Sequence, residues 1–176
     1  MSVMVGGCSR DAGSTGSAGA LEAAVRKSMS LMSGADWETA YHEVLTRNQR
    51  AACSLAEYAE TENTGLAMIR DSLGEGEISI IELNAEVVGN VGLVTGTAVY
   101  TTQLSGQVGV EGHVTGADLR ARRNLGSATA ENPDYWIFED GRWRWVQRRA
   151  DSPCYNEADM ELIRAVSQTV GSGSPH

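Results

Sequence analysis

The fold is decided by one stretch, Tyr135-Trp-Ile-Phe-Glu-Asp-Gly-Arg-Trp-Arg-Trp-Val-Gln147, which holds three of the chain's four tryptophans and its only phenylalanine. Asp140-Gly141 stands in the middle of this stretch. A two-residue hairpin turn prefers this dipeptide, because both central positions need a positive φ. The stretch therefore predicts a β-hairpin that turns at Asp140-Gly141.

The predicted hairpin has one aromatic face. A turn at Asp140-Gly141 puts Phe138 opposite Trp143 and Trp136 opposite Trp145, and side chains alternate between faces along a strand, so these four rings lie together. We expect them to seal a sheet against helices, although the same face also suits a flat apolar ligand. The other face is expected to point outward or toward a partner subunit, and it carries Tyr135, Ile137, Arg144 and Val146.

Length and charge narrow the class of protein. A chain of 176 residues is long enough for one domain with its own core. Its net charge of −9 disfavours nucleic acid as a partner, since such proteins need a basic surface. The one basic cluster is interpreted as a solvated strand edge, and it comprises Arg142, Arg144, Arg148 and Arg149. No apolar run approaches the roughly 18 residues of a transmembrane helix.

The N-terminal segment leaves two interpretations open. Val5-Gly6-Gly7-Cys8 looks like a bacterial lipobox, and the Gly/Ser-rich residues after it look like a flexible tether. However, only seven residues precede Cys8 and none of them is basic, whereas a signal peptide needs a basic region and an apolar stretch. As the chain is given we expect a cytoplasmic protein, and the alternative is an exported protein lipidated at Cys8 whose true start lies upstream.

The other two cysteines bear on the same question. In an oxidising compartment, Cys53 and Cys154 would form a disulfide that closes a loop of about 100 residues and stabilises the fold by about 4–5 kcal/mol. In the cytoplasm they would be separate thiols. The spacing of the three cysteines matches no metal site, and no metal or cofactor is predicted.

Helical periodicity dominates the first part of the domain, which we place at residues 18–150 between a tail (1–17) and a C-terminal extension (151–176). A helix is predicted over 18–32, and Asp36 is a suitable N-cap for the next one. A capping box at Ser54–Glu57 starts a short helical piece, and another is predicted over 64–73. The second helix has a core-facing side formed by Trp37, Ala40, Tyr41, Val44 and Leu45.

From Glu77 onward the pattern is that of strands. Ile78, Ile80 and Glu82 are predicted to share one face, with Ile81, Leu83, Ala85 and Val87 on the other. A second strand is predicted over 91–103, an irregular segment over 111–132, and a terminal helix over 159–169. Because helices precede strands and glycines interrupt the strands, the fold class is α+β with a strongly curved antiparallel sheet.

The order of these segments resembles a known family. The carrying segments are residues 20–32, 34–36 and 37–45, then 71–77 and 87–96, then 138–146. Together they are similar to the nuclear-transport-factor-2-like, ketosteroid-isomerase-like α+β cones, in particular the small SnoaL-like bacterial members. The resemblance implies helices packed in a curved sheet around a central pocket, and often a homodimer through the sheet. The long 46–63 segment and residues 111–132 depart from the family pattern.

The chemistry of such a pocket supplies the candidate catalytic residues. Isomerase-type proton transfer needs a carboxylate base in an apolar cavity and a hydrogen-bond donor to the substrate oxygen. Glu82 is the candidate base and Tyr41 the candidate donor. Competing interpretations make Glu82 a solvent-exposed rim residue and Tyr41 a core residue with a bonded hydroxyl. His113 and Asp118 form a second candidate pair, or are ordinary polar loop residues.

Three functions follow from these residues. The first is a pocketed binding protein for a small apolar or partly polar molecule. The second is an isomerase-, cyclase- or dehydratase-like enzyme that uses a pocket carboxylate or histidine. The third is an assembly module that dimerises through its sheet. The side chains expected to contact a ligand are Trp37, Tyr41, Tyr100, Trp136 and Trp145.

Overall fold

The computed structural model describes residues 16–103 and 120–171. Cys8, His113 and Asp118 lie outside the described residues. Four helices come first, then the strands, then a last helix. The helices are α1 (Ala18–Ser33), α2 (Trp37–Glu43), α3 (Arg47–Ala52), α4 (Leu55–Leu73) and α5 (Glu157–Gly171). The strands are β1 (Gly76–Val88), β2 (Val91–Gln103), β3 (Arg120–Ala128), β4 (Asp134–Glu139) and β5 (Arg142–Trp145).

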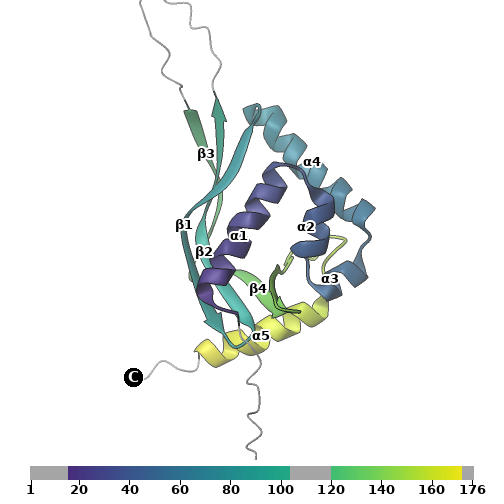
Figure 1. The fold of residues 1–176 in the computed structure, drawn as a ribbon, viewed down its shortest axis with the longest axis vertical. Coiled ribbons are helices and arrows are strands. Elements are labelled where there is room, and N and C mark those ends of the chain that lie inside the picture. The colour runs from purple at the N-terminus through teal and green to yellow at the C-terminus, as the bar shows by residue number, and fades with distance from the viewer. Residues whose placement is uncertain (1–15, 104–119, 172–176) are drawn as a thin grey trace, which may run out of the picture.

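The strands form one five-stranded antiparallel sheet in the order β1-β2-β4-β5, and β3 pairs with the second half of β2. The sheet curls into a half-barrel, and α1 lies across its concave side (Figure 1). α2, α3 and α4 continue the helical layer beyond α1 (Figure 1). The expected α+β class with a strongly curved antiparallel sheet is confirmed.

A β-bulge in β1 causes part of the curvature and changes the predicted faces. The pairing with β2 slips between Ile81 and Asn84, and Glu82 has a φ of 54°. A bulge adds one residue to one strand, so the alternation of side chains restarts after it. Ile78 and Ile80, before the bulge, and Leu83, Ala85 and Val87, after it, all pack against the same core. The prediction that these two groups lie on opposite faces of the strand is therefore wrong.

The aromatic hairpin forms as predicted. Phe138 pairs with Trp143 and Trp136 with Trp145, and Asp140 and Gly141 have φ values of 51° and 74°. All four rings belong to the core between sheet and helices, together with Leu21 and Val25 of α1. Gly92 allows this packing, because a Cβ there would lie 2.4 Å from a methyl carbon of Leu21.

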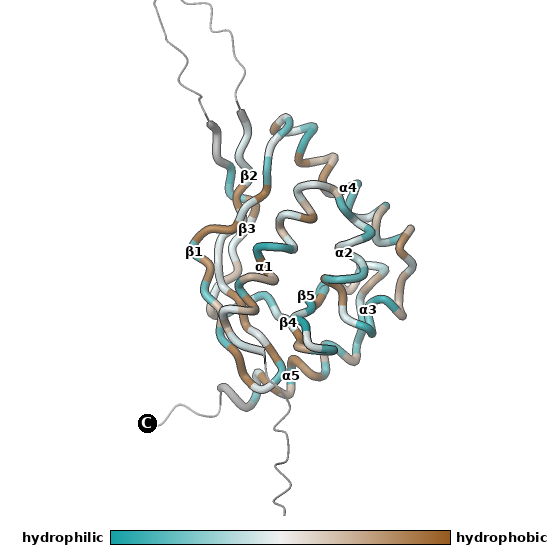
Figure 2. The backbone as a smooth tube through the Cα atoms, viewed as in Figure 1, coloured by the Kyte–Doolittle hydropathy of each residue, from teal (hydrophilic) through white to brown (hydrophobic). Residues whose placement is uncertain are grey.

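The second face of the hairpin is covered by the chain itself. Ile137 and Val146 are buried against Ile163 of α5. Figure 2 shows α5 beneath β4 and β5, with hydrophobic (brown) stretches along the helix. Arg144 is only 6% exposed and donates to the His42 carbonyl at 2.6 Å. The expectation that this face points outward or toward a partner subunit is wrong. The interpretation of Arg144 as part of a solvated strand edge is also wrong.

Three other elements differ from the sequence prediction. α3 is an unpredicted helix that begins with a capping box between Thr46 and Gln49. The two helical pieces expected after Ser54 are one continuous helix, α4, of 19 residues. β3 occupies part of the segment predicted to be irregular. In the part of the chain that the structure describes, no helix combines the length and the apolar character that a membrane crossing requires.

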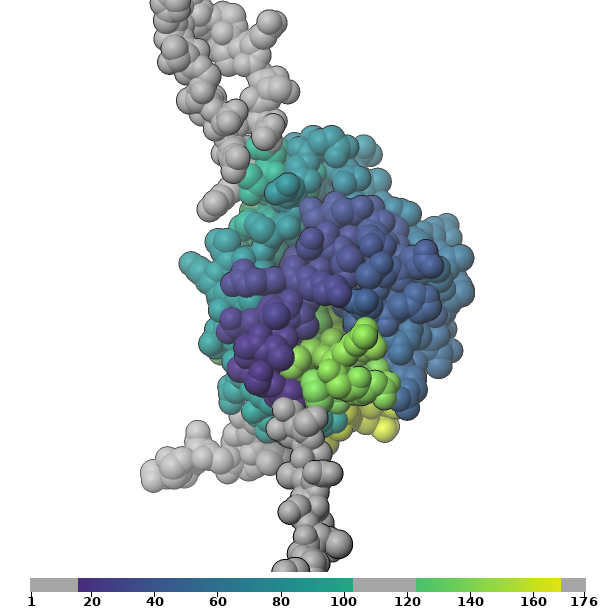
Figure 3. Space-filling model, viewed as in Figure 1, coloured from purple at the N-terminus to yellow at the C-terminus, as the bar shows by residue number. Residues whose placement is uncertain are grey.

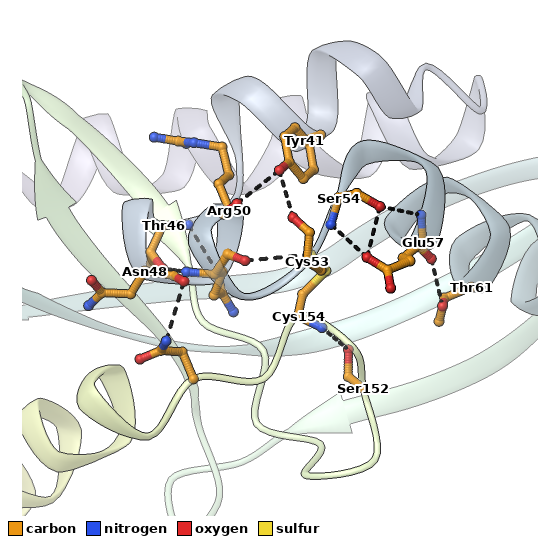
Figure 4. The surroundings of a disulfide bond; sticks show 12 residues. Tyr41, Thr46, Asn48, Arg50, Cys53, Ser54, Glu57, Thr61, Ser152 and Cys154 are labelled. Carbon is orange, nitrogen blue, oxygen red and sulfur yellow. Dashed lines mark hydrogen bonds between the residues drawn. A yellow bond between two sulfur atoms is a disulfide. The ribbon is translucent and has the colours of Figure 1, made fainter.

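A disulfide ties the C-terminal segment to the helical layer. Cys53 follows α3 and is bonded to Cys154, from which it is separated by 101 positions in sequence, with a Cα–Cα distance of 4.8 Å (Figure 4). Both cysteines are buried. Near them, Asp159 of α5 accepts hydrogen bonds from Thr46 at 2.5 Å and from Asn48 at 2.7 Å. These contacts hold α5 under the hairpin.

Candidate functional site

The predicted base and donor do not meet in a cavity. Glu82 is exposed at the bulge of β1, since the inserted residue turns its side chain away from the core. The Tyr41 hydroxyl lies 2.8 Å from the Cys53 carbonyl and 3.0 Å from the Arg50 carbonyl, to which it donates (Figure 4). Tyr41 is therefore a core residue with a bonded hydroxyl, and Glu82 is a solvent-exposed carboxylate.

Most of the aromatic residues expected to contact a ligand instead pack in the core or have their polar atom hydrogen-bonded within the protein. The Trp37 indole donates to Asn63 at 2.5 Å, and the Tyr100 hydroxyl donates to the Gly74 carbonyl at 2.7 Å. Trp136 is 2% exposed and packs in the main core. Trp145 differs, because it is half-buried and lines a cavity.

Two neighbouring cavities, here called the interior cleft, lie between the helices and the concave side of the sheet. They share Asp134 and Arg148. The apolar lobe has a volume of about 260 Å³ and is lined by Met29, Ile80, Gly96, Ala98, Gly126, Ser127, Ala128 and Asn132 besides the shared pair. The polar lobe has a volume of about 310 Å³ and adds Glu62, Trp145, Val146, Gln147 and Arg149.

The apolar lobe is hollow because the residues beneath it are small. Ala98 pairs with Gly126, and Gly96 pairs with Ala128, across β2 and β3. No side chain longer than a methyl group rises from these four positions. A Cβ at Gly126 would meet no atom within 4 Å, whereas Ile80 already packs over Gly96. Met29 of α1 closes the lobe from the helical side. The curved sheet thus leaves an unfilled concave surface instead of a fully packed one.

Glu62 reaches the polar lobe because α4 turns one side toward the core. Tyr58, Glu62 and Leu66 follow each other at intervals of four residues, so they share one helix face. Tyr58 and Leu66 are buried in the core on this face. Burial raises the pKa of the Glu62 carboxyl, and Arg149 offsets part of this rise. The neighbouring charge of Glu62 adds to burial in raising the pKa of Tyr58.

Asp134 stands where the two lobes meet. It is two residues before Trp136 on β4, so its side chain lies on the same concave face of the strand. Burial raises the pKa of this carboxyl, while Arg148, with a guanidinium nitrogen 3.8 Å away, acts in the opposite direction. The Asp134 side chain keeps 45% of its surface exposed. It is therefore a carboxyl group in the wall of an open cleft.

The two arginines of the cleft are held by neighbouring groups. Arg148 donates to the Asn132 side chain at 2.6 Å, and its guanidinium carbon lies 5.4 Å from the centre of the Tyr135 ring. Arg149 forms two hydrogen bonds with the Asp151 carboxylate, at 2.8 and 3.2 Å. These bonds fix both guanidinium groups at the rim of the polar lobe.

Two other hollows are grooves at the surface. One, of about 500 Å³, lies between α1 and β1, and several of its lining residues are exposed, among them Arg26, Ser30, Glu77 and Ser79. The other, of about 300 Å³, lies where the hairpin tip meets α1 and α2, a contact visible in Figure 3. Its charged side chains are already paired, because Lys27 and Arg142 both form ion pairs with Glu43. The interior cleft is the candidate site because it is lined by two carboxyl groups whose pKa is raised, Glu62 and Asp134.

The sequence interpretation did not include Glu62 or Asp134, although signals for both were present. Glu62 stands midway between Tyr58 and Leu66 at helical spacing, and Asp134 extends the alternation of Trp136 and Phe138 by one step. Each is a carboxyl group on an otherwise apolar face. No three His, Cys, Asp or Glu side chains come together as a metal site within the described ranges.

Comparison with known proteins identifies no relative of this chain. It matches no protein-family model, and neither the curated proteins nor the solved structures include a significant match to it.

Proposed function

We propose that the protein binds a small, partly polar organic molecule in the interior cleft. One observation carries this proposal: Asp134 and Arg148 line both lobes, so a more apolar hollow and a polar one lie next to each other. Small-molecule sites are typically clefts of roughly 300–1,000 Å³ with apolar walls and a few polar groups that fix orientation. The apolar lobe would hold the body of the ligand, and the polar lobe its polar end.

The proposal is tested by filling the apolar lobe. Ala98→Leu places a larger side chain into the hollow, whereas Thr95→Leu makes a similar addition on the opposite, convex face of the same strand. A fragment library of small amphiphiles is screened against both variants and the unmodified protein by ligand-observed NMR. We expect fragments that bind the unmodified protein and Thr95→Leu and fail to bind Ala98→Leu. If every fragment that binds the unmodified protein also binds Ala98→Leu, the interior cleft is not the binding site.

Asp134 supports a second candidate, proton transfer on the bound molecule. A general base or acid works best when its pKa lies near the working pH, and burial moves the pKa of Asp134 upward in that direction. Asp134 borders both lobes, so it can meet a ligand that spans them. This candidate replaces Glu82 as the pocket carboxylate of an isomerase-, cyclase- or dehydratase-like enzyme.

A simple base-catalysed reaction tests the second candidate. Removal of one carbon-bound proton from nitrobenzisoxazole breaks the ring N–O bond and gives a coloured cyanophenolate. We expect faster conversion with the unmodified protein than with Asp134→Asn, and no loss with Glu82→Gln. Equal rates for the unmodified protein and Asp134→Asn would rule out this use of Asp134.

The family resemblance and the homodimer remain part of the proposal. A curved sheet wrapped on one side by helices is consistent with a cone-like fold of the SnoaL-like kind. α5 occupies the outer face of the β4–β5 hairpin, so a dimer through the sheet would use the convex face of β1, β2 and β3. Light scattering coupled to size-exclusion chromatography measures whether the protein is a dimer.

A further inference from the structure

We propose that the polar lobe recognises a protonated amine, with Glu62 as its counter-ion and the Trp145 ring beside it. This inference rests on the proposed function and specifies the ligand: an amphiphilic amine whose apolar body lies in the apolar lobe. Three observations carry it, namely the bonding state of Glu62, the engagement of the two arginines, and the aromatic wall of the lobe.

Glu62 lines the polar lobe without a direct partner. Within the described residues its carboxylate has no hydrogen bond and no ion pair, and its surroundings disfavour its charge because they bury it. Arg149 is near enough to act on it electrostatically, but that guanidinium is bonded to Asp151. A half-buried carboxylate whose charge is disfavoured in this way gains from a cation that enters its cavity.

The charges around the lobe favour a cationic ligand over an anionic one. Two carboxyl groups, Glu62 and Asp134, and two guanidinium groups, Arg148 and Arg149, line the lobe. Arg148 forms an ion pair with Asp134, and Arg149 is bonded to Asp151 outside the lining, so Glu62 has no cation of its own. Arg148 is further satisfied by Asn132 and by the Tyr135 ring. An anion would have to displace these contacts, whereas an ammonium group would give Glu62 a direct partner.

Trp145 provides the second contact for an ammonium group. It is half-buried in the wall of the same lobe. Its backbone N–H donates to the Val44 carbonyl at 2.7 Å, so the residue is fixed in place. The faces of tryptophan rings attract cations, and a carboxylate with an aromatic face beside it is a combination suited to an amine.

The volume of the apolar lobe indicates the size of the apolar part of the ligand. A cavity of roughly 150 Å³ is enough for benzene, and the apolar lobe has about 260 Å³. A short aliphatic chain would then pass Asp134 and Arg148 and bring the amine to Glu62. Phenylbutylamine, with its ring and amine at opposite ends, fits this description.

The test compares three probes that share one skeleton and differ in charge: phenylbutylamine, phenylbutanol and phenylbutyrate. Binding is measured by isothermal titration calorimetry at about pH 7.5, where the amine is protonated. We expect the amine to bind at least about tenfold more tightly than the alcohol, and the acid to bind most weakly. Ala98→Leu should weaken the binding of the amine and of the alcohol alike.

Glu62→Gln and Glu60→Gln form the matched pair of variants. Both remove one negative charge from α4, but Glu60 is exposed and lines neither lobe. Glu62→Gln should bring the affinity for the amine down to that for the alcohol, and Glu60→Gln should change it less than about twofold. Equal effects of the two variants would overturn the inference.

The outcomes separate the inference from the proposed function. If the alcohol binds as tightly as the amine, and both need Ala98, the amine inference fails and the cleft remains a binding site. If none of the three probes binds, the inference also fails, and the fragment screen with Ala98→Leu decides on the proposed function by itself.

Discussion

The carboxyl groups of Glu62 and Asp134 line the same cavity, although one comes from helix α4 and the other from the first residue of strand β4. Burial raises the pKa of both. A folded protein gains no stability from placing carboxylates in such surroundings. Groups that are unfavourable for folding and face a cavity are often functional, and the pair therefore distinguishes the interior cleft from the surface grooves.

The raised pKa of Asp134 predicts how stability depends on pH. Its ordinary value is 3.8, and in the folded state the carboxyl holds its proton to a higher pH. Stability from this group is therefore full below the ordinary value and is lost as pH rises through the raised value. Asp134→Asn should remove this loss, so that at neutral pH its Tm equals or exceeds that of the unmodified protein in calorimetry.

Asp151→Asn is the control, because the pKa of Asp151 is shifted in the direction opposite to that of Asp134. Hydrogen bonds from Arg149 lower the pKa of Asp151, so its contribution is present above the ordinary value and is lost as pH falls. Its replacement should not raise Tm at neutral pH. A Tm of Asp134→Asn several degrees below that of the unmodified protein would mean that the pair with Arg148 outweighs the cost of burial.

The disulfide should contribute a large part of the stability. Closing a loop of this length removes chain entropy from the unfolded state worth about 4–5 kcal/mol. Reductant should therefore lower the guanidinium midpoint of the unmodified protein, and should leave the Cys53→Ala/Cys154→Ala double variant unchanged. In denaturant without reductant, a thiol assay should detect one of the three cysteines. Three reactive thiols would show that the bond does not form.

Asp159 is predicted to anchor α5. Its carboxylate is 3% exposed and accepts from Thr46 and Asn48. Hydrogen bonds to charged groups are worth about 1.5–3 kcal/mol each, so Asp159→Ala, which removes two of them, should lower the free energy of unfolding by about 3 kcal/mol or more. Glu161→Ala, an exposed change on the same helix, should have little effect. Chemical denaturation of both variants makes the comparison, and equal stabilities would contradict it.

Tyr41 is predicted to act in folding and not in binding. Its hydroxyl donates to main-chain carbonyls around the disulfide, so Tyr41→Phe should cost about 1 kcal/mol of stability. Calorimetric affinity for a ligand of the cleft should stay unchanged. A variant of unchanged stability that loses the ligand would restore the expectation that Tyr41 is a donor in the site.

The aromatic hairpin shows how much of the fold was readable from sequence. Asp140-Gly141 and the alternating aromatic residues specify the turn, the register and the core face by local rules. Helix starts at Asp36 and Ser54 are also local, and both are present. The face opposite the aromatic rings was not predictable in this way, because α5 reaches it only through tertiary contacts and the disulfide.

The candidate site was harder to read. The bulge at Glu82 moves that side chain to solvent, and no residue pattern in the strand indicated one extra residue. Glu62 was hidden because the segment 54–73 was divided into two helical pieces, which broke the spacing of Tyr58, Glu62 and Leu66. The apolar lobe depends on which small residues of β2 and β3 face each other, and this follows from pairing between distant segments.

Proton–nitrogen correlation NMR during a titration with phenylbutylamine tests the central claim most directly. Saturable shifts are expected at the backbone amides of four residues that line the interior cleft, Ala98, Ala128, Asp134 and Glu62. The amide signals of Gly34 and Glu77, in the groove between α1 and β1, should not shift. Shifts confined to that groove, or spread weakly over the surface without saturation, would contradict the account.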